Sequence, residues 1–337
     1  MIHKRHFLHL IALAAMTLAG TSTAHAQRVI RIVVPYGPGA VQDTVARAIS
    51  NELGAALGAS VIVENKAGAG GTLGTAVVAK SPADGNTLVM AAASHHIAGH
   101  LYAKLPYDPV KDFVGVAYLG TSGYVIAAPG NMAVNNLADY VRELKAKPGQ
   151  LNYASAGNGS ATHLGMAAFL SKAGLQMQHI PMKSTGDAVN EVLAGRVQGV
   201  TAALIGVTGF KGDARLKMLA YTGPRRSKFL PDLPTVAEAG VPGYTFDSWF
   251  GLLGPAGMPK AEIERINNAV HKVMADPAVQ ERFARFGTET GSLTPEEFQK
   301  LLRADYDTAG AIVKASGAKI DCYVRHVWEL QAKSRLF

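Results

Sequence analysis

The sequence predicts an α/β fold in which two lobes with mostly parallel sheets enclose a cleft. Short β-branched, apolar runs alternate with segments whose apolar residues recur at helical spacing, which is typical of parallel strands covered by helices. Twice, at residues 35–43 and 155–163, a glycine-rich turn joins a strand to a helix. Ligands bind at the carboxyl ends of parallel strands, so two such turns that face each other predict one cleft.

The first 26 residues have the features of an export signal. Lys4 and Arg5 precede an apolar run at residues 7–19, and Ala24-His25-Ala26 is typical of a signal peptidase site. We therefore expect cleavage after Ala26 and a mature protein in the periplasm. A membrane anchor is the alternative, but the apolar run is shorter than the roughly 20 residues that span a bilayer.

Composition indicates a globular protein with a sizeable core. The chain has 337 residues, of which 48% are hydrophobic and 17% charged, and its net charge is +8. This length permits one large domain or two of medium size. The basic residues form no stripe interleaved with aromatic residues, so we expect no nucleic-acid partner. Cys322 is the single cysteine and has no partner for an internal disulfide. We expect a monomer without a cofactor.

The first strand–helix unit follows the export signal. Asp43 stands at the expected N-cap of a helix in which Val45, Ile49, Leu53 and Leu57 repeat at helical spacing. The patterns predict strands at 30–34, 61–63 and 87–92, and a second helix at 75–80 after a glycine-rich turn at 68–74. A helix N-terminus offers free N–H groups and a partial positive charge. The turn at 35–43 therefore predicts a site for a small anion.

A second unit begins near residue 133. The patterns predict a helix at 138–146, a strand at 151–154 and a helix at 164–173, which follows the turn at 155–163. Towards the C-terminus, an amphipathic helix covers residues 263–273, and another starts at Pro295 after Thr294 as its N-cap. Two units of this kind place a second turn opposite the first.

Six stretches together resemble the solute receptors of tripartite tricarboxylate transporters, also called Bug-type receptors. They are VVPYGPGAVQD (33–43), VIVENKAGAGG (61–71), DGNTL (84–88), LNYASAGNGSATH (151–163), LPTVAEAG (233–240), and WFGL with GPAG (249–257). The resemblance covers residues 28–321. It implies a fold similar to type II periplasmic binding proteins, with two lobes that close on a small organic acid and no catalysis. It also implies delivery of the acid to membrane permease subunits.

The same resemblance implies boundaries for the lobes. The first lobe would comprise residues 27–128 and, after the chain returns, 248–321. The second lobe would comprise residues 129–247. Residues 322–337 extend past the usual end of the family, and we expect either a disordered tail or a short amphipathic helix.

Ligand contacts are implied on both turns and on two neighbouring segments. We expect them from Tyr36, Gly39 and Ala40 on the first turn, Ser94 and His95 after the strand at 87–92, Gly159, Ser160 and Thr162 on the second turn, and Lys183 and Ser184 beyond it. Backbone groups of the first turn and the hydroxyls of Ser160 and Thr162 would hold a carboxylate. His163 is either a structural hydrogen-bonding residue or a ligand contact.

Four positions near the expected cleft depart from the family pattern. Ala40 and Ser184 replace glycines, Met182 replaces an aromatic residue, and Gln198 replaces an aspartate. Either the ligand differs from the common dicarboxylates, or these are neutral changes in surface loops.

The motifs that would indicate a hydrolase, a sensor or a metal site are weaker than those of the receptor family. No G-x-S-x-G elbow is present, so a hydrolase would depend on Ser160 with His163 as its base. A periplasmic sensor would bind the same ligand but deliver it to a signalling partner. His95, His96 and His100 form a cluster in which His96 and His100 could share a helix face and bind a metal, but no carboxylate or cysteine lies in the same segment. We expect Trp249 to be a packing residue rather than a ligand platform.

Overall fold

The computed structural model describes residues 28–316 of the chain. The expected export signal at 1–26, Cys322 and the expected tail at 322–337 lie outside these residues. Within residues 28–316, ten strands form one curled mixed sheet whose main path is β2-β1-β3-β9-β4-β7-β5-β6, while β8 and β10 pair with β4. No helix among the described residues has the length and apolar character to cross a membrane.

The strands are β1 (Val29–Val34), β2 (Ser60–Asn65), β3 (Thr87–Ala92), β4 (Phe113–Pro129), β5 (Asn152–Ser155), β6 (Gln178–Pro181), β7 (Gly199–Ala203), β8 (Leu216–Tyr221), β9 (Asp247–Pro255) and β10 (Glu289–Thr290). The α-helices are α2 (Val41–Leu57), α3 (Thr72–Ala79), α4 (Ser94–Leu101), α5 (Leu137–Ala146), α6 (Ala161–Ala173), α7 (Thr185–Leu193), α8 (Leu204–Val207), α9 (Lys260–Met274), α10 (Pro277–Arg285) and α11 (Pro295–Ser316). Short 3₁₀ turns occupy Ala69–Gly71 and Thr208–Phe210.

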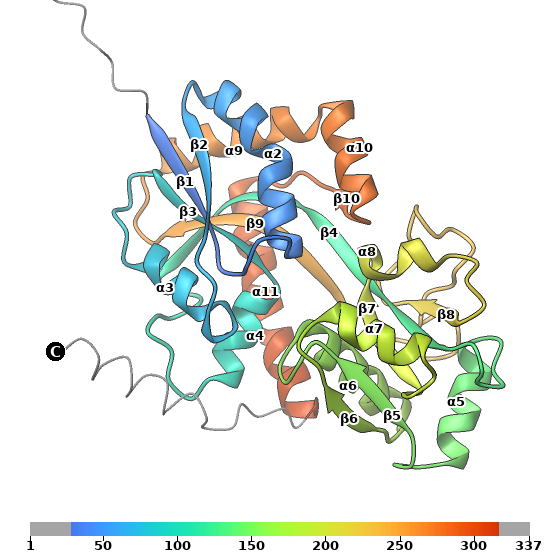
Figure 1. Ribbon diagram of the computed structural model, residues 1–337. Coiled ribbons are helices and arrows are strands. Elements are labelled where there is room, and N and C mark those ends of the chain that lie inside the picture. The colour runs from blue at the N-terminus through green and yellow to red at the C-terminus, as the bar shows by residue number, and fades with distance from the viewer. Residues whose placement is uncertain (1–27, 317–337) are drawn as a thin grey trace, which may run out of the picture.

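Two halves are joined by the long strand β4. Figure 1 shows β1, β2 and β3 with α2 and α9 in one half and β5 to β8 in the other. The first part of β4, Phe113 to Gly123, pairs with β9, whereas Tyr124 to Pro129 pairs with β7 and β8. The outer three strands of each half are parallel, as predicted. Strand β4 is antiparallel to β7, β8, β9 and β10, and β9 is also antiparallel to β3.

Helix α11 packs against both halves. Its first turns bury Phe298 and Leu302 in an apolar cluster with Val33 and Val89 of the first sheet. Its last turns place Ala309 and Val313 in a different cluster, with Phe169 and Tyr140 of the second half. Helix α11 therefore connects the apolar cores of the two halves.

The N-terminal ends of α2 and α6 lie earlier than the apolar pattern predicts. Asp43 is not the N-cap of α2, because Ala40 takes that position and the helix begins at Val41. Asp43 lies in the first turn instead, where its carboxylate accepts the Gly39 N–H at 2.9 Å. Likewise α6 begins at Ala161, with Ser160 as its N-cap. A side-chain cap marks the start of α6, whereas α2 starts after Ala40 without one.

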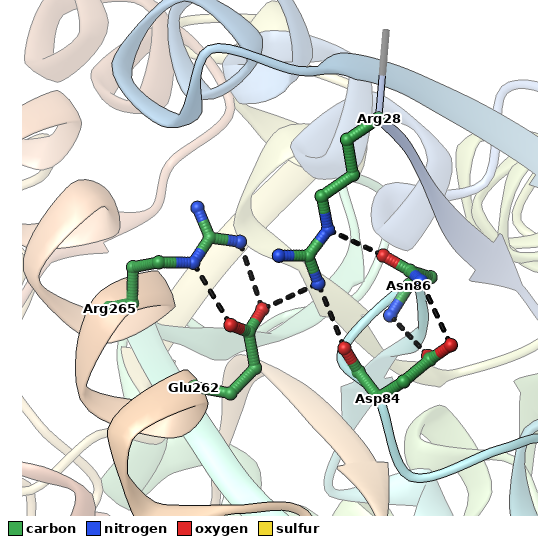
Figure 2. Close-up of polar contacts among 5 residues, drawn as sticks. All are labelled: Arg28, Asp84, Asn86, Glu262 and Arg265. Carbon is green, nitrogen blue, oxygen red and sulfur yellow. Dashed lines mark hydrogen bonds and ion pairs between the residues drawn. The ribbon is translucent and has the colours of Figure 1, made fainter. Parts of the chain in front are cut away.

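An ion-pair network fastens the amino end of β1. Figure 2 shows the Arg28 guanidinium between the 84–86 turn and α9. Its Nη2 donates to Glu262 Oε1 at 2.7 Å and to the Asp84 carbonyl at 2.8 Å, and its Nε donates to Asn86 Oδ1 at 2.6 Å. Arg265 binds the same Glu262 carboxylate, and the hydrogen bonds from Arg265 hold the pKa of Glu262 below its ordinary value. The start of β1 is thus fixed, and with it the turn that follows the strand.

Candidate functional site

A cavity of about 630 Å³ lies between the two halves. The predicted site residues that line it are Tyr36, Gly39, Ala40 and Ser94 from the first half and Gly159, Ser160, Thr162, Lys183 and Ser184 from the second. The two glycine-rich turns therefore face one shared space. Four further lining residues come from the strands that cross between the halves, namely Ser122, Tyr124, Ser248 and Phe250.

The first turn is held together from behind by Asp43. This carboxylate accepts hydrogen bonds from the Gly39 N–H, Arg47 Nε and Asn65 Nδ2, each at 2.9 Å. Burial alone would raise the pKa of Asp43, but the hydrogen bonds from Arg47, Gly39 and Asn65 lower it below its ordinary value. Asp43 is 4% exposed and remains an anion that faces the turn rather than the cavity.

The backbone N–H groups that the first turn can offer differ from those expected. The Gly39 N–H is bound to Asp43, and the Ala40 N–H donates to the Gly37 carbonyl at 3.2 Å. Val41 and Gln42 occupy the first turn of α2 and line the cavity. Their N–H groups have no acceptor among the described residues, as is usual at a helix start. Gly39 and Ala40 thus contribute to the cavity wall, while the free N–H donors are those of Val41 and Gln42.

The second turn is built by side-chain oxygens. Ser160 Oγ donates to the Gly157 carbonyl at 2.7 Å and accepts the His163 N–H at 3.2 Å. Thr162 Oγ1 accepts the Ala156 N–H at 2.8 Å, which closes the loop from the end of β5. The Gly159 N–H donates to His163 Nδ1 at 3.1 Å. His163 therefore supports the turn from within the fold and is absent from the cavity lining.

A third helix start completes the wall on the second half. Ser184 caps α7 by accepting the Asp187 N–H at 3.1 Å, and Thr185 and Gly186 of the first turn line the cavity. Lys183 immediately precedes the cap, and its side chain is exposed to the cavity. Among the described residues that line the cavity, Lys183 is the only charged one.

These features make the cavity favourable for an anion. The starts of α2, α6 and α7 all contribute to its wall, and each aims unpaired N–H groups and the positive end of a helix dipole towards it. The ammonium of Lys183 adds a full positive charge. No carboxylate of the described residues lines the cavity to oppose a bound acid.

Tyr36 contributes a hydroxyl that is fixed in place. Its OH donates to Ser94 Oγ at 3.0 Å and lies 3.3 Å from the Gly70 carbonyl. Burial raises the pKa of Tyr36, with the Ser94 hydrogen bond acting against the shift, so the phenol stays protonated. A Cβ atom on Gly70 would lie 2.6 Å from Tyr102 OH. The glycine run at 68–71 thus permits close packing against the tyrosines of the wall.

His95 lies outside the cavity lining, and its contact with a ligand stays a prediction. Ser94 and His95 are the first two residues of helix α4, so their side chains point in different directions. His95 is 6% exposed and its Nε2 lies 2.9 Å from the Pro109 carbonyl, while burial lowers its pKa to about 3.

The histidines considered for a metal site have other partners. His96 Nδ1 lies 2.6 Å from Asp305 Oδ2, and His100 Nε2 lies 2.9 Å from the Tyr306 carbonyl. In residues 28–316, no group of three or more His, Cys, Asp or Glu side chains is placed to hold a metal ion.

Two of the four departures from the family pattern lie outside the cavity lining. Gln198 Oε1 accepts the Asn152 N–H at 3.0 Å and so closes the start of β5. Met182 packs against the apolar cluster of the second half. Ala40 and Ser184, in contrast, do line the cavity. An effect of Met182 or Gln198 on the ligand stays a prediction.

The sequence reasoning missed the floor of the cavity. Ser248 and Phe250 line it, while Trp249 between them is 5% exposed and packs in the core, as expected. Ser122 and Tyr124 of β4 show the same alternation. The alternation of side chains along a strand predicts which residues share a face of the sheet. Which of the two faces meets the cavity depends on pairing between segments far apart in the sequence.

Comparison with known proteins identifies the family. Residues 45–318 match the model described as "Tripartite tricarboxylate transporter family receptor". A relative from Pseudomonas sp. strain P51, the UPF0065 protein in the tcbD-tcbE intergenic region, is 33% identical over 90% of this chain and 92% of its own. Among solved structures, R. palustris Rpa4515 with adipate has a TM-score of 0.78 and 28% identity, covering 88% of this chain and 100% of its own. MatC from Rhodopseudomonas palustris with bound malate has a TM-score of 0.74 and 28% identity, covering 85% and 99%. The chain therefore belongs to the receptor family of tripartite tricarboxylate transporters, whose members are solute-binding proteins.

Proposed function

We propose that this protein is a periplasmic receptor that captures a small organic acid between two lobes and delivers it to permease subunits of a tripartite tricarboxylate transporter. The observation that carries the proposal is the cavity wall. Three helix starts and Lys183 line it, and no carboxylate of the described residues does. The related structures with adipate and malate support a carboxylate as the ligand.

Capture would proceed by a population shift. The lobes would be residues 27–128 with 248–321, and residues 129–247, with the mature chain starting after Ala26. An acid that contacts both turns has more partners when the lobes approach each other, so binding favours the closed form. Strand β4 would act as the hinge, since its first part pairs with β9 and its last part with β7.

A binding role fits the second turn better than hydrolysis does. Ser160 Oγ donates to the Gly157 carbonyl, and His163 Nδ1 accepts the Gly159 N–H. Within residues 28–316, Ser160 Oγ thus donates to no imidazole that could serve as the base a serine nucleophile needs. A sensor role would share the same site and would differ only in the partner that receives the ligand.

The test combines mass spectrometry and calorimetry. Native mass spectrometry of the freshly purified protein should reveal a retained small acid, and titration with adipate and malate should give binding without turnover. Lys183→Gln should weaken a dicarboxylate at least tenfold, because a hydrogen bond to a charged group contributes about 1.5–3 kcal/mol. The matched control is Lys272→Gln, which removes an exposed lysine of α9 outside the cavity. Equal effects of the two variants, or preference for uncharged solutes, would contradict the proposal.

A further inference from the structure

The two cavity turns share one plan. In the first, the Gly39 N–H donates to Asp43 Oδ2 at 2.9 Å, and in the second the Gly159 N–H donates to His163 Nδ1 at 3.1 Å. Both glycines are left-handed, with φ of 82° and 74°. Each acceptor lies four residues after its glycine, on the third residue of the following helix. The turns differ in the acceptor, which is a carboxylate in one and an imidazole in the other.

This difference makes the turns respond differently to acid. Asp43 remains an acceptor well below neutral pH, because Arg47, Gly39 and Asn65 all donate to it. His163 accepts the Gly159 N–H only while Nδ1 carries no proton. A protonated ring would present N–H against N–H, and the second turn would lose the bond that fixes Gly159.

A second histidine is coupled to the first. The rings of His163 and His179 stack with centroids 3.9 Å apart and planes 7° apart. His179 Nε2 lies 2.6 Å from Ser155 Oγ, which accepts the Gly157 N–H at 3.0 Å. The stacked pair therefore supports both ends of the turn. Two charged rings at this separation would repel each other.

The surroundings offer the pair no compensating anion. Tyr153 of β5 stacks on His179 with centroids 5.0 Å apart, and Tyr244 donates its hydroxyl to the Gly165 carbonyl of α6. Asp305 of α11, which packs beside α6, is paired with His96. Lys183 lines the cavity beyond β6. Within residues 28–316, no carboxylate is hydrogen-bonded to either ring of the pair.

We propose that His163 and His179 are positioning residues for ligand capture, and that their protonation releases the second turn while the Asp43 turn keeps its geometry. This inference rests on the receptor function proposed above. Neutral rings hold the turn at 157–160 against the ligand. Ligand affinity then falls in mild acid through loss of the second-lobe contact.

The expected pH range follows from the burial of the pair. Burial lowers the pKa of His163, and burial together with the neighbouring His163 lowers that of His179 to about 4. A depressed pKa means that the native geometry favours the neutral ring. Its contribution is therefore complete above the ordinary histidine pKa of about 6.5 and is lost as the pH falls towards 4.

The deciding experiment follows backbone amides of the ¹⁵N-labelled protein from pH 8 to 4 without ligand. The Gly159 amide shift should move with the same midpoint as the His163 imidazole nitrogens, before any change at the Gly39 amide. His163→Asn supplies an acceptor that does not titrate, so the Gly159 response should disappear from this range. His179→Gln removes the second ring and its repulsion, so the midpoint should rise. His271→Gln, on the distant helix α9, should retain the wild-type response.

Adipate affinity at pH 7.5 and 4.0 gives the functional readout. The wild-type affinity should fall at least about twofold more than that of His163→Asn, because about half of a ring with a pKa of about 4 is protonated at pH 4.0. The comparison with the variant cancels protonation of the acid itself. Titration of Gly39 and Gly159 together, or an unchanged Gly159 amide down to pH 4, would overturn the positioning role. Failure to bind adipate would count against the proposed ligand, whereas the Gly159 titration decides the role of the histidines whichever acid binds.

Discussion

A single buried side chain, Asp43, organises the first cavity turn without facing the cavity. Its carboxylate gathers the Gly39 N–H, Arg47 and Asn65, and Asn65 in turn donates to the Tyr36 carbonyl at 3.0 Å. The charge is needed where three donors converge, and the helix start of α2 stabilises it further. The carboxylate of Asp43 can therefore lie close to an anion site, because its three hydrogen-bond donors compensate its negative charge.

Replacing Asp43 by alanine should disturb both stability and binding. The Gly39 N–H and the Asn65 amide would each lose a hydrogen bond to a charged acceptor. Such bonds contribute about 1.5–3 kcal/mol, so the free energy of unfolding should fall by about 2 kcal/mol. Denaturant titration measures this loss, and calorimetry should show weaker acid binding. Asp139→Ala is the matched control, because Asp139 accepts the Asn135 N–H in the same way at α5, outside the cavity. Weakened binding in the control variant would contradict a specific role for Asp43.

At the scale of elements, helix starts supply polar groups to the site, whereas one face of α4 supplies Ile97, Ala98 and Leu101. Ser160 and Ser184 each cap a helix whose first turn lines the cavity, whereas Asn136 caps α5 away from it. The same capping chemistry thus stabilises all three helices, but only the first two present free N–H groups to the cavity.

Two alanine substitutions separate these roles. Ser160→Ala and Asn136→Ala each remove an N-cap acceptor and should each lower the free energy of unfolding by about 1 kcal/mol. Only Ser160→Ala should also weaken binding of the acid, because its cap shapes the second turn. Paired measurements of denaturation and affinity check this, and equal affinities in the two variants would argue against the turn as a contact.

The sequence predicted these elements better than it predicted the cavity. The strand at 87–92 coincides with β3, because its apolar run is bounded by polar residues. The starts of α2 and α6 were misplaced because the apolar repeat begins inside each helix, after its capping residues. Ser122 and Ser248 face the cavity only through the antiparallel register of β4 on β9, which pairs these two residues directly. Such a register depends on contacts more than a hundred residues apart and leaves no local signal.

For the molecule as a whole, the halves are linked by more than the crossing strands. Helix α11 buries side chains in both cores, and Arg225 after β8 forms an ion pair with Glu289 of β10 at 3.0 Å. Glu289 belongs to the short strand that pairs with the first part of β4. Any movement of one half against the other must therefore be accommodated by α11 and β4 together.

The shared helix predicts that the two halves unfold as one unit. Phe298 lies against Gly251 and Gly115 in the first half, and Val313 lies in the second core. Phe298→Ala should lower stability by about 3–5 kcal/mol and Val313→Ala by about 1.5 kcal/mol. Because α11 couples the cores, both variants should shift the same single calorimetric transition, and a saturating acid should raise it. Val77→Ala, at an exposed site on α3, should leave it almost unchanged. Two resolved transitions, each moved by one variant only, would mean that α11 does not couple the halves and that each folds on its own.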